Sequence, residues 1–165
     1  MSLEVMQALA AYQIAGILKS SKSTRKVFKT VCARDVATRP PKKIATFPQA
    51  FIHNTGFVGR GIHWVLIYYT KAYTLFFDSF GRSPKELFLE SSAKSTPNPI
   101  VYNVKTLQRA GSPVCGHYCI YFLTRLANGD SLASINTAFG KNLRKNDQLV
   151  FNFVKKLAAR CRVPL

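Results

Sequence analysis

Apolar side chains recur at helical spacing near both ends of the chain. Residues 3–18 and 143–161 place apolar residues three and four positions apart, which predicts an amphipathic helix in each segment, the first one capped by Ser2. Residues 115–129 carry an almost continuous apolar run that stops at Gly129, as expected for a buried helix. The pattern therefore predicts helices at both ends and a third one that is buried.

The middle of the chain alternates between runs typical of β-strands and short turn-forming segments. Strands rich in β-branched and aromatic residues are expected at 47–54, 62–69, 73–80 and 99–105. Residues 27–36 suit either a strand or a helix, and Ser83 before Pro84 predicts a further helix within 81–92. The pattern as a whole predicts a single α+β domain over residues 1–165, with a central, mostly antiparallel sheet and flanking helices.

A hairpin is expected where two of these strands are separated by Thr70, Lys71 and Ala72. Facing residues of a hairpin have position numbers with a constant sum, and a sum of 141 would place Asp78 opposite His63. Asp78 interrupts an otherwise apolar run, where an unpaired carboxylate is costly. We therefore expect Asp78 to have a partner, and His63 is the candidate.

Basic residues dominate the charge of the chain. Its 165 residues include 24 lysines and arginines and 7 acids, a formal net charge of +17, which is concentrated in residues 1–50 (+7) and 141–165 (+6). Such an excess favours polyanions, although the same residues could simply form a solvated surface. The residues expected to bind DNA are Lys42, Lys43, Lys141, Arg144, Lys145, Lys155 and Lys156.

Cysteine content and hydropathy bear on the compartment. Four cysteines are too few for a disulfide scaffold in a chain of this length. The longest apolar run is broken by Lys71, and the apolar N-terminal segment carries Glu4 and lacks the features of a leader peptide. We expect a monomer with free thiols that makes no membrane contact and stays inside a cell or particle.

The stretch SPVCGHYC, residues 112–119, carries two cysteines and a histidine. A structural zinc site needs four ligands, usually in two close pairs, and the sequence holds no second pair, so no metal is expected. Cys119 lies within an apolar helix and is expected to be a buried core thiol. Cys115 stands where a Ser-Pro turn becomes a helix, and a helix N-terminus stabilises a thiolate. Cys115 is therefore the candidate nucleophile.

A nucleophilic thiol needs a base, a group that orients the base, and donors for an oxyanion. His63 is the histidine best placed to be the base, with Asp78 as the orienting group. Gln108, seven residues before Cys115, is the expected oxyanion donor together with the Cys115 backbone amide. Two neighbours are expected in the substrate cleft, Trp64 and Gly116. The other histidines are expected to be surface or packing residues, His53 and His117.

The ordered motifs GIHW, FFDSFG and LQRAGSPVCGHYC resemble those of the adenovirus-type cysteine endopeptidases, the adenain family, which shares a clan with proteases of ubiquitin-like proteins. The resemblance covers roughly residues 27–158. The segment FIHNTG resembles the family's strand before the histidine motif, and VCARDV with the prolines that follow is similar to a segment of proteases of the adenovirus-related polinton and adintovirus group. It implies a papain-like cysteine protease fold with the nucleophile on a central helix. It assigns the catalytic roles to His63, Asp78, Gln108 and Cys115.

The resemblance also implies a biological setting. Relatives mature virion precursor polypeptides in the host nucleus and the virion interior, and they cleave after small residues, typically glycine. They are activated by DNA and by a short capsid-derived peptide, so DNA is the expected activator here, the peptide is a second candidate, and no metal or small-molecule cofactor is expected. Residues 82–107 contain no cysteine, so the disulfide that holds this peptide in mammalian adenovirus enzymes has no counterpart there. The orienting acid is Asp78, where the best-known members have Glu.

Two other functions fit part of the pattern. A deconjugating protease for ubiquitin-like proteins would share the FFDSFG motif and the preference for glycine before the cut. A basic nucleic-acid-binding virion protein without enzymatic activity would explain the charge. It would not explain the ordered set of histidine, aspartate, glutamine and cysteine.

Overall fold

A five-stranded sheet forms the centre of the protein in the computed structural model, which describes residues 5–33, 44, 46–56 and 63–165. The strands lie in the order of the sequence: β1 Phe28–Cys32, β2 Gln49–Asn54, β3 Trp64–Tyr69, β4 Thr74–Phe77 and β5 Ile100–Tyr102. The β2–β3 and β3–β4 pairings are antiparallel, as predicted, whereas the outer β1–β2 and β4–β5 pairings are parallel. Parallel neighbours need a long connection, and the segments before β2 and before β5 are long enough to provide one.

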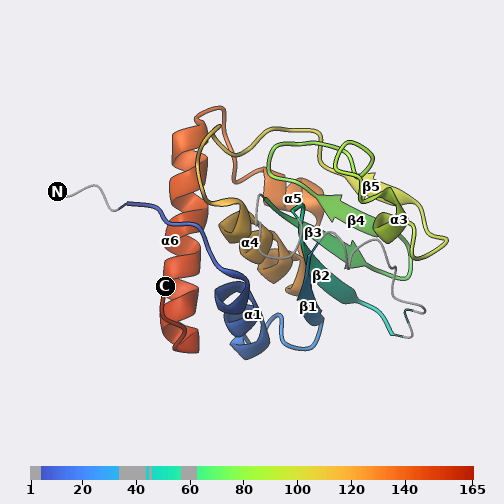
Figure 1. The fold of residues 1–165 in the computed structure, drawn as a ribbon, viewed down its shortest axis with the longest axis horizontal. Coiled ribbons are helices and arrows are strands. Elements are labelled where there is room, and N and C mark those ends of the chain that lie inside the picture. Colours follow the sequence, from blue (N-terminus) through green and yellow to red (C-terminus); the bar gives the residue numbers. More distant parts are fainter. Residues whose placement is uncertain (1–4, 34–43, 45, 57–62) are drawn as a thin grey trace.

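The helices are α1 Ala11–Ser20, α3 Glu90–Ala93, α4 Cys115–Ala127, α5 Leu132–Asn136 and α6 Leu143–Cys161. Figure 1 shows α1, α4 and α6 on one side of the sheet, with α4 next to the strands and α6 outermost. The predicted buried helix is confirmed as α4, whose residues are nearly all buried, and the predicted C-terminal helix is confirmed as α6. The short α5 was not predicted.

Apolar residues are buried on both faces of the sheet. On the helical side, the ring of Phe77 stacks on Phe122 of α4 with centroids 3.7 Å apart. On the other side, Ile67 and Phe76 pack against Leu87 and residues near it. Strands β3 and β4 are thus covered on both faces, which explains why their sequences are continuously apolar instead of alternating.

The N-terminal helix is shorter than predicted. Helix α1 begins at Ala11, and the described residues 5–10 have no regular secondary structure. The side chain of Gln13 accepts the backbone N–H of Ala10 at 2.9 Å and so marks the helix start. Leu9 is buried in the core, so its apolar character serves packing rather than a helical stripe. Ser2, the predicted cap, lies outside the described residues.

The prediction of a helix within residues 81–92 was wrong. Ser83 and Glu86 do form the reciprocal bonds of a helix start: the Ser83 N–H donates to the Glu86 carboxylate at 2.7 Å, and the Glu86 N–H donates to Ser83 Oγ at 3.3 Å. Phe88 then adopts a left-handed conformation with φ of 56°, which ends the turn. Only the four-residue α3 follows.

The hairpin is confirmed, but its predicted register was wrong by two residues. Leu66 pairs with Phe77, so facing positions sum to 143 rather than 141. The hydroxyl oxygen of Thr70 accepts the N–H groups of Ala72 and Tyr73 at 3.2 and 3.0 Å, and the turn is centred one residue later than predicted. Because the offset is even, every strand residue keeps its face of the sheet.

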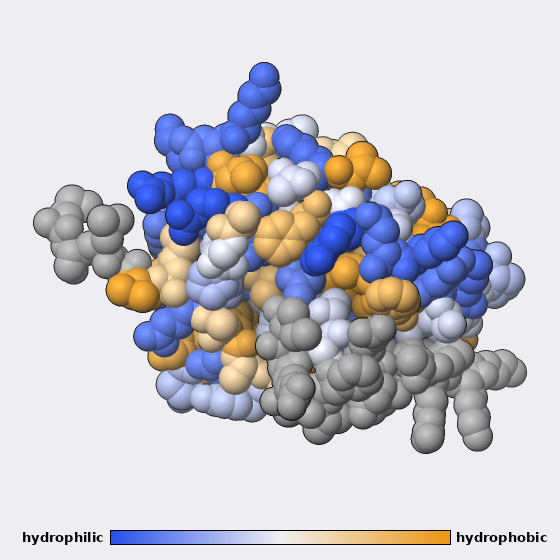
Figure 2. All heavy atoms as spheres, turned by 45° about the horizontal axis from the view of Figure 1, so that its top comes forward, coloured by the Kyte–Doolittle hydropathy of each residue, from blue (hydrophilic) through white to orange (hydrophobic). Residues whose placement is uncertain are grey.

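The surface is mixed in polarity. Figure 2 shows hydrophilic side chains over much of one face, with apolar groups in small separate patches among them. Within the described part of the chain, no helix is both long and apolar enough to cross a membrane.

Candidate active site

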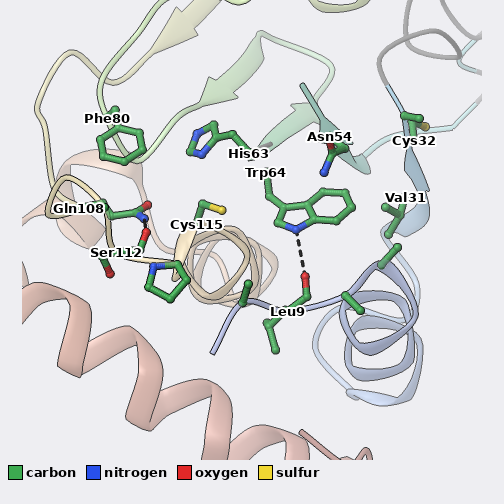
Figure 3. Close-up of a pocket in the computed structure, with 16 residues that line it drawn as sticks. Leu9, Val31, Cys32, Asn54, His63, Trp64, Phe80, Gln108, Ser112 and Cys115 are labelled. Carbon is green, nitrogen blue, oxygen red and sulfur yellow. Dashed lines mark hydrogen bonds between the residues drawn. The ribbon is translucent and has the colours of Figure 1, made fainter. Parts of the chain in front are cut away.

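The four predicted catalytic residues lie together at one end of the sheet. His63 directly precedes β3 and Asp78 directly follows β4, and these two strand ends are neighbours. Cys115 is the first residue of α4, which packs on β3, and Gln108 lies in the loop that leads to α4. In Figure 3, the sulfur of Cys115 and the ring of His63 face the same cavity, with Gln108 beside them. The fold thus brings together residues that are up to 52 positions apart in the sequence.

A dense set of hydrogen bonds holds Asp78. His63 Nε2 lies 2.5 Å from Asp78 Oδ1, and the other carboxylate oxygen accepts the backbone N–H and Nε–H of Arg82 at 3.0 and 2.8 Å. The side chain of Asn103 accepts the Asp78 N–H at 3.1 Å and donates to its carbonyl oxygen at 2.7 Å. Asp78 itself is completely buried. The carboxylate therefore has a fixed position and a compensated charge.

The pKa values of this pair are shifted in opposite directions. Burial alone would raise the pKa of Asp78, but hydrogen bonds from His63 and Arg82 outweigh it and lower that pKa to about 2. Burial alone would lower the pKa of His63, but its hydrogen bonds and charge interactions with Asp78 and Cys115 outweigh it, and the pKa is raised. Asp78 is therefore ionised near neutral pH, and the protonated imidazole is stabilised.

The pairing with Asp78 determines which nitrogen of His63 faces the thiol. Because Nε2 binds the carboxylate, Nδ1 is the nitrogen left to exchange a proton with Cys115. The thiol lies near enough to influence the pKa of the imidazole, and Cys115 is 9% exposed. As the first helical residue, Cys115 also has a backbone N–H with no acceptor inside the helix. This arrangement can generate a thiolate and has an amide next to it.

Gln108 is held with its amide nitrogen on the side of Cys115. Its Oε1 accepts the hydroxyl of Ser79 at 2.6 Å, and its Nε2 donates to the carbonyl oxygen of Ser112 at 2.5 Å. The residue is buried to 99%. An amide nitrogen carries two hydrogens, so Nε2 keeps one that could reach an oxyanion.

A cleft with a volume of about 820 Å³ contains the site. Its walls include Trp64 and the N-terminal segment Ala8–Ala11 on one side of Cys115 and Gln108 and Ser112 on the other (Figure 3). The indole N–H of Trp64 donates to the carbonyl oxygen of Leu9 at 3.1 Å and so ties this segment to the site. The N-terminal wall was not foreseen, because an Ala- and Leu-rich segment fits a helical pattern equally well.

Gly116 lies behind this wall and does not line the cleft. A Cβ atom added to it would meet Ile14 Cδ1 at 3.1 Å, Trp64 Cδ1 at 3.3 Å and Leu9 Cβ at 3.4 Å. Its lack of a side chain instead lets Trp64 and the N-terminal segment pack closely on α4. Of the two residues expected in the cleft, Trp64 lines it and Gly116 supports it.

The buried thiol and the two buried histidines outside the catalytic set are packing residues, namely Cys119, His53 and His117. Cys119 is completely buried, as expected for a core thiol, and burial raises its pKa. His53 and His117 are also buried, and burial lowers the pKa of each to about 4. Cys32 lies at the edge of the cleft. Among the described residues, no group of three or more histidine, cysteine, aspartate or glutamate side chains could hold a metal ion.

The basic residues expected to bind DNA are concentrated on α6. Five of them are exposed on this helix or just before it: Lys141, Arg144, Lys145, Lys155 and Lys156. The acid of this helix, Asp147, is buried, so all charged residues on the exposed face are basic. Lys42 and Lys43 lie outside the described residues.

The α+β fold, with its central sheet and the helices packed on it, is similar to the folds of several solved structures. Among solved structures, ChlaDub1 from Chlamydia trachomatis is similar with a TM-score of 0.66 and 13% identity, over 98% of this chain and 95% of that one. The Chlamydia trachomatis effector protein Cdu1 bound to ubiquitin is similar with a TM-score of 0.63 and 13% identity, over 96% of this chain and 95% of that one. An ASFV protease is similar with a TM-score of 0.65 and 14% identity, over 92% of this chain and 67% of that one. At these identities the similarity concerns the fold. No family model and no curated protein sequence matches the chain.

Proposed function

We propose that the protein is a cysteine endopeptidase with Cys115 as nucleophile, His63 as base and Asp78 as the residue that orients the base. The observation that carries the proposal is the juxtaposition of a thiol at a helix N-terminus with an imidazole whose other nitrogen is 2.5 Å from a buried carboxylate. Three unrelated segments contribute to this arrangement. Core packing alone does not require it.

The reaction follows from the geometry. His63 Nδ1 takes the proton of Cys115, and the thiolate attacks the carbonyl carbon of the scissile peptide. The Cys115 backbone N–H and Gln108 Nε2 stabilise the oxyanion. The imidazolium protonates the leaving amine, and water activated by His63 then hydrolyses the thioester and restores the thiol. Asp78 keeps Nε2 protonated and stabilises the imidazolium, and no step requires a metal or a small-molecule cofactor.

The substrates under this proposal are virion precursor polypeptides, cleaved after small residues such as glycine. The resemblance to adenain-type proteases, within the polinton and adintovirus group, supports this choice. The cleft around Cys115 supports it as well. Trp64 and the N-terminal segment lie on one side of the nucleophile and Gln108 and Ser112 on the other, and walls on both sides favour a small residue at the scissile bond. The setting would be the host nucleus and the virion interior, with the enzyme acting as a monomer.

DNA is the proposed activator, and a capsid-derived peptide is the second candidate. The net charge of +17 and the exposed basic face of α6 support attraction to DNA. A protease held on packaged DNA would meet DNA-bound precursors at high local concentration.

A deconjugating protease for ubiquitin-like proteins is the second candidate function. One observation favours it: the chain covers 95% of Cdu1, which was solved bound to ubiquitin, with a TM-score of 0.63. Ubiquitin-like substrates also end in glycine before the scissile bond, so the chemistry near Cys115 would be the same.

Cleavage of a fluorogenic Leu-x-Gly-Gly amide and of a ubiquitin fusion tests both candidates. Wild type and Cys115→Ala are each assayed with and without DNA. The proposal expects release from the peptide that depends on Cys115 and increases with DNA. Turnover of the ubiquitin fusion far above that of the peptide, without a DNA effect, would favour the deconjugating protease. DNA binding without any cleavage or reaction of Cys115 with alkylating agents would favour a binding protein.

A further inference from the structure

Two polar residues on the buried side of α6 reach the loop that carries Gln108. Asn146 Nδ2 donates to the carbonyl oxygen of Leu107 at 3.1 Å. Asp147 Oδ1 lies 3.4 Å from the backbone nitrogen of Arg109 and accepts its N–H. These are the peptide groups directly before and after Gln108. The backbone on both sides of the oxyanion donor is therefore bound by α6.

The same two residues are themselves held in place. The side chain of Asn146 binds both polar groups of Gly140, accepting its N–H and donating to its carbonyl oxygen, each at 3.0 Å. Tyr118 of α4 lies between the two contacts: its hydroxyl is 2.9 Å from the Leu107 carbonyl oxygen and 3.0 Å from Asp147 Oδ1. Helix α4, which begins with the nucleophile, and helix α6 thus bind the loop jointly.

Stability alone does not explain these residues. Asn146 and Asp147 are 3% and 1% exposed, and burying a carboxylate is costly unless it is fully compensated. Compensation of Asp147 is incomplete: burial raises its pKa even though Ser112 and Tyr118 act to lower it, and no described residue makes a hydrogen bond of normal geometry to its Oδ2. An apolar residue would fill this part of the core at lower cost. The polar contacts of Asp147 with described residues lead to the Gln108 loop or to Tyr118.

The position of Gln108 Nε2 depends on these contacts. Its side chain is oriented by Ser79 and Ser112, but both bonds assume that the backbone at Gln108 stays in place. An oxyanion donor must be positioned within about 0.5 Å to be effective. Displacement by about 1 Å can lower a rate by about a hundredfold.

We propose that Asn146 and Asp147 are positioning residues of the oxyanion hole, which act through Gln108. The inference rests on the proposed function, because it assumes that Gln108 stabilises an oxyanion. It adds to that function a direct connection between the buried side of α6 and the loop that carries Gln108. The exposed side of the same helix is basic.

The experiment compares two reactions of the same thiol. Peptide cleavage passes through an oxyanion, whereas alkylation by iodoacetamide is a displacement at a saturated carbon and needs no oxyanion hole. Asn146→Ala and Asp147→Ala are expected to lower kcat by about 10- to 100-fold with KM within about twofold. Their alkylation rates at Cys115 should stay within about twofold of wild type, since His63 and Asp78 are untouched. Asp147→Asn keeps a side-chain oxygen for Tyr118 and Arg109 and should recover most of the loss.

Rates are divided by the concentration of Cys115 that can be titrated. A variant that only folds poorly then shows fewer active sites, whereas its rate per active site is unchanged. Gln148→Ala is the matched control, because Gln148 is exposed on the same helix and binds Asn152 instead of the loop. If Asp147→Ala does not fold, Asn146→Ala decides the question.

A double-mutant cycle separates this inference from the proposed function. Gln108→Ala should lower kcat by itself, and adding Asn146→Ala should lower it little further, because both changes act through the same amide. Multiplicative losses, or a parallel loss of alkylation rate, would overturn the positioning role. Full activity of Gln108→Ala would instead overturn the assignment of Gln108 in the proposed function.

Discussion

His63 and Asp78 bind each other although they do not face each other across the hairpin. The β3–β4 register pairs Leu66 with Phe77, so Asp78 is offset from His63 by two positions. Nevertheless, His63 Nε2 lies 2.5 Å from Asp78 Oδ1. Both residues stand just outside their strands, and their side chains together span the offset.

Replacing Asp78 by asparagine tests the role of this pair. We expect Asp78→Asn to lower kcat by about 100-fold or more, because a neutral amide no longer stabilises the imidazolium or fixes its tautomer. KM should change little, and the pKa of His63 should fall, which the pH dependence of Cys115 alkylation would report. Arg82→Ala is the control: it leaves the carboxylate and the backbone N–H of residue 82 in place and should cost about tenfold or less. Equal activity of Asp78→Asn and wild type would contradict an orienting role.

The catalytic set could be predicted from the sequence because two members have a local signal and the order and spacing of all four, including His63 and Gln108, add to it. Cys115 follows a Ser-Pro turn at the start of an apolar helix, and Asp78 is an acid within an apolar strand. The offset between His63 and Asp78 could not be predicted, because it depends on how the hydroxyl of Thr70 closes the turn. The prediction that His63 and Asp78 are partners was nevertheless correct, because the two side chains bridge an offset of two residues at the ends of the strands.

Other features depend on contacts between distant segments and left no local signal. The segment before Ala11 is a cleft wall because the carbonyl oxygen of Leu9 accepts the indole N–H of Trp64, 55 residues away. The contact between Arg109 and Asp147 spans 38 residues. In the sequence, Asp147 is simply an acid in a basic amphipathic helix, and nothing marks it as buried.

Acidification should destabilise the fold through His53 and His117. Each has a pKa of about 4 when folded, against about 6.5 in an unfolded chain. Between these values the unfolded chain binds protons that the folded protein does not, so the free energy of unfolding falls as the pH falls. Each histidine should account for about 2–3 kcal/mol of the loss between pH 7 and pH 4.5. Urea unfolding at both pH values measures this loss.

Removing one of these histidines gives the matching control. His117→Phe should show a drop in unfolding free energy between pH 7 and pH 4.5 that is smaller by about 2–3 kcal/mol than in wild type. His63→Ala should not reduce the acid drop: the raised pKa of His63 stabilises the fold below about 6.5 and loses that effect as the pH rises through the folded value. An unchanged acid drop in His117→Phe would show that the imidazole is not buried as a neutral group.

Adding one methyl group at residue 116 should disturb both stability and the cleft. In Gly116→Ala, the new Cβ would lie 3.1 Å from Ile14 Cδ1 and 3.3 Å from Trp64 Cδ1, so these side chains must move. We expect a loss of about 1–3 kcal/mol in unfolding free energy and a raised KM, because Trp64 lines the cleft. Gly140→Ala is the control, since a Cβ there meets no atom within 4 Å and should leave both quantities unchanged. A stable variant with normal KM would contradict this prediction, because it would show that Trp64 and Ile14 can move aside without a loss of stability or of substrate binding.

Neutralising the exposed face of α6 should weaken DNA binding in a salt-dependent manner. A phosphate contact releases a condensed counterion, so each lost contact lowers the slope of log K against log salt by about 0.9. We expect Lys145→Gln with Lys156→Gln to reduce this slope by about 2 and to weaken DNA-stimulated cleavage, while DNA-independent cleavage stays unchanged. Lys71→Gln with Lys85→Gln removes the same charge from exposed positions outside α6, near the β3–β4 turn and after Pro84. If both double variants lower the slope equally, then the attraction comes from net charge, and α6 is not a specific DNA-binding face.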